Sequence, residues 1–139
     1  MARIADTTLL VGLERRGLKP ADLLLLGEPE EAWSLTAISV GEMLYGVHQS
    51  PTAAYRSQHE AFLEAFLEAI PVLPFDLRSA RVYGRLLCEH RRDLEARRID
   101  VHDLQIAATA LAYGCEIVTD NLSHFRLVQG LKVVAPRWP

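Results

Sequence analysis

The chain has 139 residues, half of them hydrophobic, and a formal net charge of −3 at pH 7. A chain of about this length buries roughly 70% of its unfolded surface in one core, so we expect a single domain over residues 1–139. The longest apolar run, residues 23–26, is far shorter than the about 20 residues that cross a bilayer. Because Asp6 interrupts the N-terminal apolar run, a secretory signal is not expected either. We therefore expect a soluble cytoplasmic protein that does not bind membranes, and the negative charge argues against dense coating by nucleic acid.

Short apolar runs alternate with helical patterns along the whole chain. Strands are predicted at residues 4–5, 32–35, 72–75, 116–119 and 131–134. Helices are predicted from about residue 9 to Gly17, over 20–26, 39–47, 52–69 and 76–96, and over 103–113 with Gly114 as C-cap. Such alternation predicts an α/β fold with a mostly parallel sheet and helices on both faces.

Three carboxylates lie where a short apolar run passes into a probable helix: Asp6 in ARIAD, Glu42 in TAISVGE and Asp103 in IDVHD. In a parallel α/β sheet these junctions share one edge, so the three acids are expected to converge there. Converging carboxylates repel one another and raise each other's pKa unless a cation holds them. Hard oxygen ligands suit Mg²⁺ or Mn²⁺, so the pattern indicates a magnesium site.

Each acid also has a purely local explanation at a helix start. Asp6 can be an ordinary N-cap, because its side-chain oxygen can accept hydrogen bonds from free backbone amides. Ser39 to Glu42 matches a capping box, and Asp100 to Asp103 allows the same arrangement with Asp103 at the third helical position. Taken singly, each of these acids is explained by capping.

A fourth junction, after the predicted strand at 116–119, is also polar and acidic, with Thr119, Asp120 and Asn121. Capping gives no reason for acids at four such places, so the conjunction favours a cation site. Magnesium usually keeps waters and substrate phosphates among its ligands, which points to phosphate chemistry.

The order and spacing of these motifs resemble the PIN-domain ribonucleases and, within that family, the VapC-type toxins of toxin–antitoxin systems. The resemblance rests on Asp6-Thr7-Thr8, on residues 35–46, 103–110 and 117–121, and on Phe125 followed by residues 130–133. It covers nearly the whole chain. It implies a three-layer α/β/α fold with a mostly parallel sheet of roughly five strands, and metal-dependent hydrolysis of RNA phosphodiester bonds.

The resemblance also implies a set of site residues. Asp6, Glu42 and Asp103 are the catalytic acids and metal ligands that it implies, with Thr7, Thr8 and Thr119 as supports near the metal or the substrate phosphate. A fourth ligand position falls on Asn121, with Asp120 beside it, so either residue can complete the metal site. An Asn there weakens the charge balance of a second metal, which favours one tightly held Mg²⁺ in the free protein. Asp100 is an additional acid that can supplement the missing fourth carboxylate.

Partners follow from the same resemblance: an RNA substrate, a small cognate antitoxin and a second copy of the chain in a homodimer. Six arginines are candidates for phosphate contacts, although a solvated helix face also explains most of them: Arg15, Arg16, Arg91, Arg92, Arg97 and Arg98. Apolar residues at 23–26, Phe62 and Phe66 are candidate partner contacts, which core burial explains equally well. Cys88 and Cys115 are expected to be buried free thiols.

Other functions remain open at this point. A phosphoaspartyl enzyme is disfavoured because its second Asp is expected where this chain has Thr8. Ser39 lacks a nearby His–Asp pattern, so we interpret it as a helix cap and not a nucleophile. His102 and His124 flank the motifs, and a surface or supporting role is expected for both. A catalytically silent PIN-like module that binds RNA or protein, and a housekeeping PIN nuclease, are the remaining alternatives.

Overall fold

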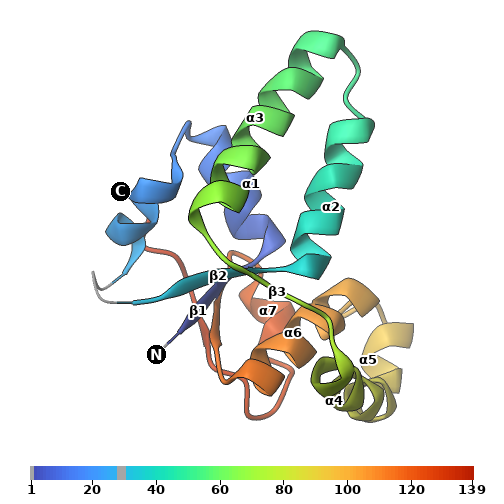
Figure 1. The fold of residues 1–139 in the computed structure, drawn as a ribbon. Helices are drawn as coiled ribbons and strands as arrows, with labels where there is room; N and C mark the ends of the chain where they lie inside the picture. The colour runs from blue at the N-terminus through green and yellow to red at the C-terminus, as the bar shows by residue number, and fades with distance from the viewer. Residues whose placement is uncertain (1, 28–30) are drawn as a thin grey trace.

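A computed structural model describes residues 2–27 and 31–139. Its strands are β1 (Arg3–Ala5), β2 (Trp33–Thr36), β3 (Val72–Leu73), β4 (Glu116–Val118) and β5 (Val133–Val134). They form one sheet in the order β3-β2-β1-β4-β5, in which every neighbouring pair is parallel (Figure 1). The predicted parallel sheet of five strands is confirmed.

Helices cover both faces of this sheet (Figure 1). One face carries α1 (Thr7–Arg15), the 3₁₀ helix η1 (Pro20–Leu26), α2 (Ala37–His48) and α3 (Ala53–Ala69). The other carries α4 (Leu77–Glu89), α5 (Arg91–Glu95), α6 (Val101–Tyr113) and α7 (Leu122–Phe125). The three-layer α/β/α architecture is therefore confirmed.

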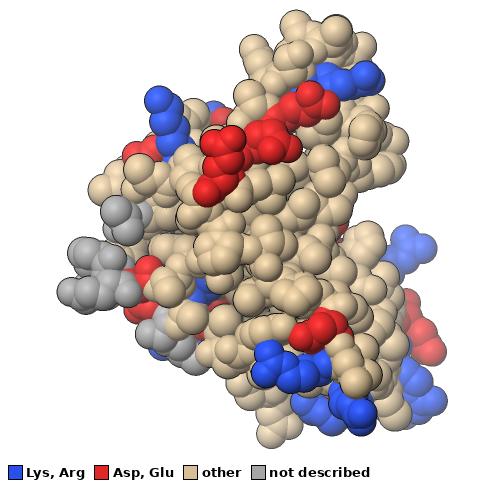
Figure 2. Space-filling view, in the orientation of Figure 1, with Lys and Arg blue, Asp and Glu red and all other residues tan. Residues whose placement is uncertain are grey.

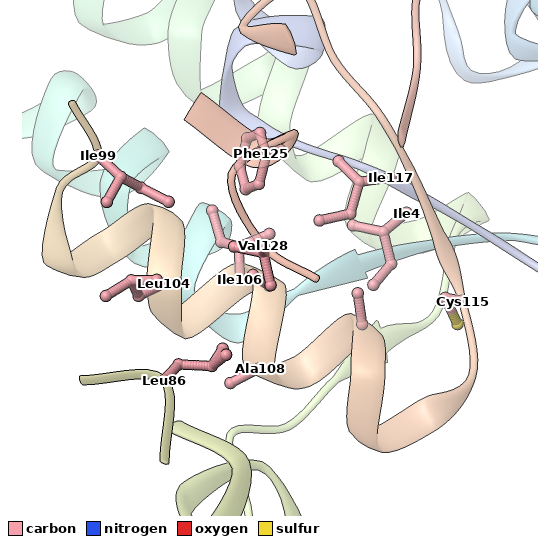
Figure 3. Close-up of a cluster of buried hydrophobic side chains, with 12 residues drawn as sticks. Ile4, Leu86, Ile99, Leu104, Ile106, Ala108, Cys115, Ile117, Phe125 and Val128 are labelled. Atoms are coloured by element: carbon pink, nitrogen blue, oxygen red, sulfur yellow. The ribbon is translucent and has the colours of Figure 1, made fainter. Parts of the chain in front are cut away.

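Two hydrophobic cores result from the alternation of side chains along each strand. Ile4 and Ile117 point into the core under α6, where they pack with Leu104 and Phe125 (Figure 3). Their chain neighbours Ala5 and Val118 point to the opposite face and pack in the core with α1, η1, α2 and α3. Strands buried on both faces read as continuous apolar runs, as in other parallel sheets. The carboxyl ends of the strands thus lie between two layers of helices, each packed on the sheet through its own core.

The predicted helix over 76–96 is wrong in one respect, because it breaks at His90. The backbone of this residue has φ −109° and ψ 21°, and its ring nitrogen Nδ1 lies 2.9 Å from Oδ2 of Asp93. Separate helices, α4 and α5, follow from this break. The short helix α7 was not predicted, and the strand bounds differ from the predicted ones by one or two residues at most ends.

Most of the apolar candidates for partner contacts belong to the core. Leu23, Leu26 and Phe66 are buried, whereas Leu25 keeps 59% of its surface exposed. Both thiols are free as expected, but Cys88 is exposed, contrary to its predicted burial in the core. Among the described residues, no helix is both long and apolar enough to cross a membrane.

Candidate functional site: a carboxylate cluster at the end of the sheet

Asp6 follows β1 and begins α1 as its N-cap. Its Oδ1 accepts hydrogen bonds from the Leu9 amide at 3.0 Å and from the Thr8 hydroxyl at 2.8 Å. The Thr119 hydroxyl, which follows β4, donates to Oδ2 at 2.7 Å. The predicted cap is confirmed, and the carboxylate is held by both neighbouring strand ends.

The Asp6 carboxyl is only 1% exposed. Its pKa is raised from 3.8 to about 6, chiefly by burial and to a smaller extent by the negative charge of Asp103, while the hydrogen bonds from Thr119, Leu9 and Thr8 oppose the rise. The site therefore holds an acid that is readily protonated near neutral pH unless a cation stabilises its ionised form.

Glu42 lies on α2, one turn beyond the helix start. The predicted Ser39–Glu42 capping box is wrong, because β2 extends to Thr36 and α2 starts two residues before Ser39. Thr36 is the actual N-cap, and its hydroxyl oxygen accepts from the Ser39 amide at 3.1 Å. Glu42 instead accepts a hydrogen bond from the Thr7 hydroxyl at 2.7 Å. Burial raises the pKa of Glu42, and the Thr7 bond opposes this effect.

Asp103 lies in the first turn of α6, which Asp100 caps by accepting from the Asp103 amide at 2.8 Å. The Asp103 side chain is free of this cap, and its Oδ2 lies 2.8 Å from Nδ1 of His124. Burial raises the pKa of Asp103, while the contact with His124 lowers it. The charge of Asp103 also raises the pKa values of both Asp6 and Glu42, which places the three acids in one electrostatic cluster.

The side chains of Asn121 and Asp120 make different contacts. The Asn121 amide lies 2.8 Å from the same His124 nitrogen that contacts Asp103. The side-chain nitrogen Nδ2 of Asn121 can donate only to an unprotonated ring nitrogen, whereas an ionised Asp103 accepts only from a protonated one, so the two contacts compete for Nδ1 of His124. The Asp120 carboxylate instead accepts from the Trp138 indole N–H at 3.3 Å, while its backbone amide donates to Thr8. Asn121, unlike Asp120, thus shares the neighbour His124 with Asp103.

Two residues that contact the site acids, His124 and Trp138, were not predicted as site residues from the sequence. His124 touches Asp103, and the available signal was its position three residues after Asn121, one turn along a short helix. Trp138 touches Asp120 from the C-terminal segment, and no motif indicated it. Ser39 is buried beside Thr7, with 3.0 Å between the two hydroxyl oxygens.

The donor chemistry of the cluster fits a hard divalent cation, since it consists of neutral hydroxyl oxygens and of carboxylates whose negative charges repel one another. In the described residues, however, no three His, Cys, Asp or Glu side chains are arranged to hold a metal as they stand. Each acid is already engaged, Asp6 by Thr8 and Thr119, Glu42 by Thr7, and Asp103 by His124. A carboxylate oxygen accepts more than one interaction, so a cation can bind these acids while the threonine hydroxyls keep their hydrogen bonds.

Cavities open around the cluster. A cavity of about 360 Å³ between α1, α2 and α3 and one of about 620 Å³ between α2 and α6 share Thr7 and Glu42 in their linings. Figure 2 shows a notch between the part of the molecule with α2 and α3 and the part with α4 to α6. Further cavities of about 470 Å³ and 500 Å³ reach Arg15 and Arg97, respectively. Thr7 and Glu42 thus line two cavities that open beside the carboxylate cluster.

Known proteins match both the sequence and the fold. The PIN domain family profile matches residues 4–130. Ribonuclease VapC1 of Rickettsia felis is 30% identical over 136 residues, which cover 96% of each chain. Ribonuclease VapC19 of Mycobacterium tuberculosis is 33% identical over 133 residues, which cover 94% of this chain and 97% of the relative. The crystal structure of Rickettsia felis VapBC2 bound to a promoter DNA fragment matches with a TM-score of 0.82 and 23% identity, covering 98% of this chain and 99% of the other. The chain therefore belongs to the PIN-domain family and, within it, to the VapC group.

Proposed function

We propose that this protein is a Mg²⁺-dependent endoribonuclease of one domain over residues 1–139, with Mn²⁺ as a substitute ion, and the toxin of a toxin–antitoxin pair. The observation that carries the proposal is the gathering of Asp6, Glu42 and Asp103 from the N-terminal parts of three separate helices, with pKa values raised by burial and by neighbouring negative charges. The relatives named Ribonuclease VapC support the ribonuclease activity.

Asp6 and Asp103 are the direct ligands in this proposal, and Glu42 acts beside them. The cation, when bound, neutralises phosphate charge and lowers the pKa of an attacking water. Thr119 and Thr8 fix the orientation of the Asp6 carboxylate, and Thr7 does the same for Glu42. Water is the nucleophile in this proposal. Ser39 is not a candidate, because it is buried among hydroxyl groups.

The main alternative is a catalytically silent module that binds RNA or protein, and it arises because Asn121 stands where a fourth acid is expected. A neutral amide at this place supplies one charge fewer than an acid, and Asp120 is directed to Trp138. The ionisable groups that remain argue for activity, because one buried and two half-buried carboxylates that repel one another destabilise a fold that has no cation to hold. We therefore favour one tightly bound metal, with substrate phosphate completing any second site.

Cleavage of structured RNA tests the nuclease. Wild-type protein with Mg²⁺ or Mn²⁺ should cut the RNA, and Asp6→Asn and Asp103→Asn should lose this activity. Asp93→Asn is a matched control, because this carboxylate on α5 contacts His90 and Arg98 away from the cluster. Equal cleavage by wild type and both site variants would exclude the proposed site, and binding without cleavage by the wild type would favour the silent module.

Toxicity separates a regulated toxin from a housekeeping nuclease. Expression should arrest growth, and co-expression of the small open reading frame next to the gene should relieve the arrest by supplying the antitoxin. Structures of VapBC complexes, which match this chain in fold, support a protein partner of this kind. Size measurement of the purified chain tests the proposed homodimer, and cell fractionation tests its proposed cytoplasmic location.

A further inference from the structure

Arg97 has an unusual backbone conformation. Its φ is +57°, and it is the one non-glycine residue with positive φ among residues 2–27 and 31–139. The residue follows the end of α5, and its amide donates to the Leu94 carbonyl at 3.1 Å. Glycine commonly occupies such a helix end, because a side chain in the left-handed region costs roughly 1–2 kcal/mol. Residues held in such strained conformations cluster at functional sites, where the side chain has a role that offsets the strain.

The Arg97 side chain lines the cavity of about 500 Å³ beside the carboxylate cluster. Asp100, Val101 and His124 line the same cavity, and His124 is the residue that touches Asp103. The cavity therefore extends from the edge of the proposed catalytic site to an arginine at the surface.

The guanidinium of Arg97 is available to a ligand. Its neighbour Arg98 donates to Asp93 at 3.2 Å, whereas Arg97 is exposed and has no ion-pair partner within the described part of the chain. Arg91 and Arg92 are exposed on α5, the short helix that precedes Arg97. Figure 2 shows basic side chains gathered over α4 and α5, whereas acidic side chains follow α3 on the other part of the molecule.

We propose that the cavity between α5 and the start of α6 is a subsite for the RNA backbone, in which Arg97 binds a phosphate that neighbours the scissile one. This inference rests on the proposed ribonuclease function. A planar guanidinium makes paired, charge-assisted hydrogen bonds to phosphate oxygens, and it keeps its charge at all relevant pH values. Positive charge here also offsets the repulsion between Asp100, Asp103 and an approaching polyanion.

Substitution by glycine makes the test unusually clear. Arg97→Gly removes the charge and also the left-handed strain, so the variant should unfold at a higher temperature than wild type while binding RNA less tightly. Lost binding in a more stable protein is not a folding defect. Arg97→Lys keeps the charge and should retain the salt dependence of binding, but it should lose part of the affinity because an ammonium group cannot make the paired hydrogen bonds of a guanidinium. Arg98→Gln is the control for a neighbouring arginine that is already paired.

The measurement is the anisotropy of a short fluorescent single-stranded RNA with metal-free protein in EDTA, over a series of salt concentrations. For Arg97→Gly, the affinity should fall about three- to tenfold at low salt, and the slope of log K against log salt should become shallower by about 0.7, the value for one phosphate contact on a single strand. The rate of RNA cleavage with Mg²⁺ at limiting substrate should fall in parallel.

An unchanged slope and affinity for Arg97→Gly would overturn the subsite. An equal loss in Arg98→Gln would also overturn it, because a diffuse field would then explain the binding. If Arg97→Gly binds RNA normally but loses the cognate antitoxin, the cavity belongs to a protein partner and the inference fails. Wild-type protein that neither binds nor cuts RNA would instead refute the proposed function itself.

Discussion

Thr119 donates its hydroxyl hydrogen to Oδ2 of Asp6 at 2.7 Å, across the paired strands β1 and β4 and 113 residues apart in sequence. Thr119→Val removes this bond and should raise the pKa of Asp6 further. A hydrogen bond to a charged group contributes about 1.5–3 kcal/mol, so metal affinity and RNA cleavage at neutral pH should fall roughly tenfold or more. Thr109→Val is the control, because this buried hydroxyl donates only to the Gln105 carbonyl. A similar loss in both variants would contradict a specific role for Thr119.

Asp6 should make the metal-free protein less stable as pH rises. Its folded pKa of about 6 exceeds the ordinary value of 3.8, so the stability linked to its protonation is complete below pH 3.8 and is lost as pH rises through 6. Asp6→Asn should flatten this dependence and increase the free energy of unfolding at pH 7 by up to roughly 3 kcal/mol.

Urea unfolding in EDTA between pH 4 and 8 measures this effect, with Asp76→Asn as the matched N-cap. The Tyr113 hydroxyl donates to Asp76 and lowers the pKa of that carboxyl, so its stabilising contribution is present at neutral pH and is lost on acidification. Asp76→Asn should therefore destabilise the protein at pH 7, opposite in sign to Asp6→Asn. The same sign for both variants would contradict the argument.

Divalent cations should stabilise the folded protein. A ligand that binds only the folded state at a hundredfold excess over its Kd adds about 2.7 kcal/mol, so MnCl₂ should raise the unfolding temperature of wild type. Asp103→Asn should lose this response and Asp93→Asn should keep it. Calorimetric titration with Mn²⁺ gives the number of bound ions directly, and two ions in the absence of RNA would refute the single-metal proposal.

Gly12 provides the space in which the C-terminal Trp138 lies. A Cβ atom at residue 12 would come within 2.7 Å of the indole ring, which also packs 3.7 Å from the Arg16 guanidinium carbon. Gly12→Ala should displace Trp138, increase iodide quenching of its fluorescence and free Asp120 from the indole N–H. Gly84→Ala, on α4 with no atom near its added Cβ, should instead stabilise the protein by about 1 kcal/mol through helix propensity. Unchanged quenching in Gly12→Ala would show that the ring adapts.

The convergence of Asp6, Glu42 and Asp103 was predictable because parallel strands end at a common edge. The residue whose hydroxyl caps α2 was not predictable, since Thr36 and Ser39 both match the local pattern and the extent of β2 decides between them. The contact of His124 with Asp103 depends on α7, a four-residue helix too short to show a periodic pattern. Local rules thus located the acids, while their neighbours depended on tertiary packing.

The position of β1 at the centre of the sheet has a consequence for synthesis on the ribosome. Ile4 pairs with Ser34 on one side and Ile117 on the other, so β1 waits on the ribosome for a partner made more than 100 residues after it. Such long-range pairing delays folding until both partners are available. Until residue 119 has emerged, Asp6 lacks both Thr119 and its place beside β4. The growing polypeptide therefore carries an incomplete carboxylate cluster until β4 and Thr119 have been made.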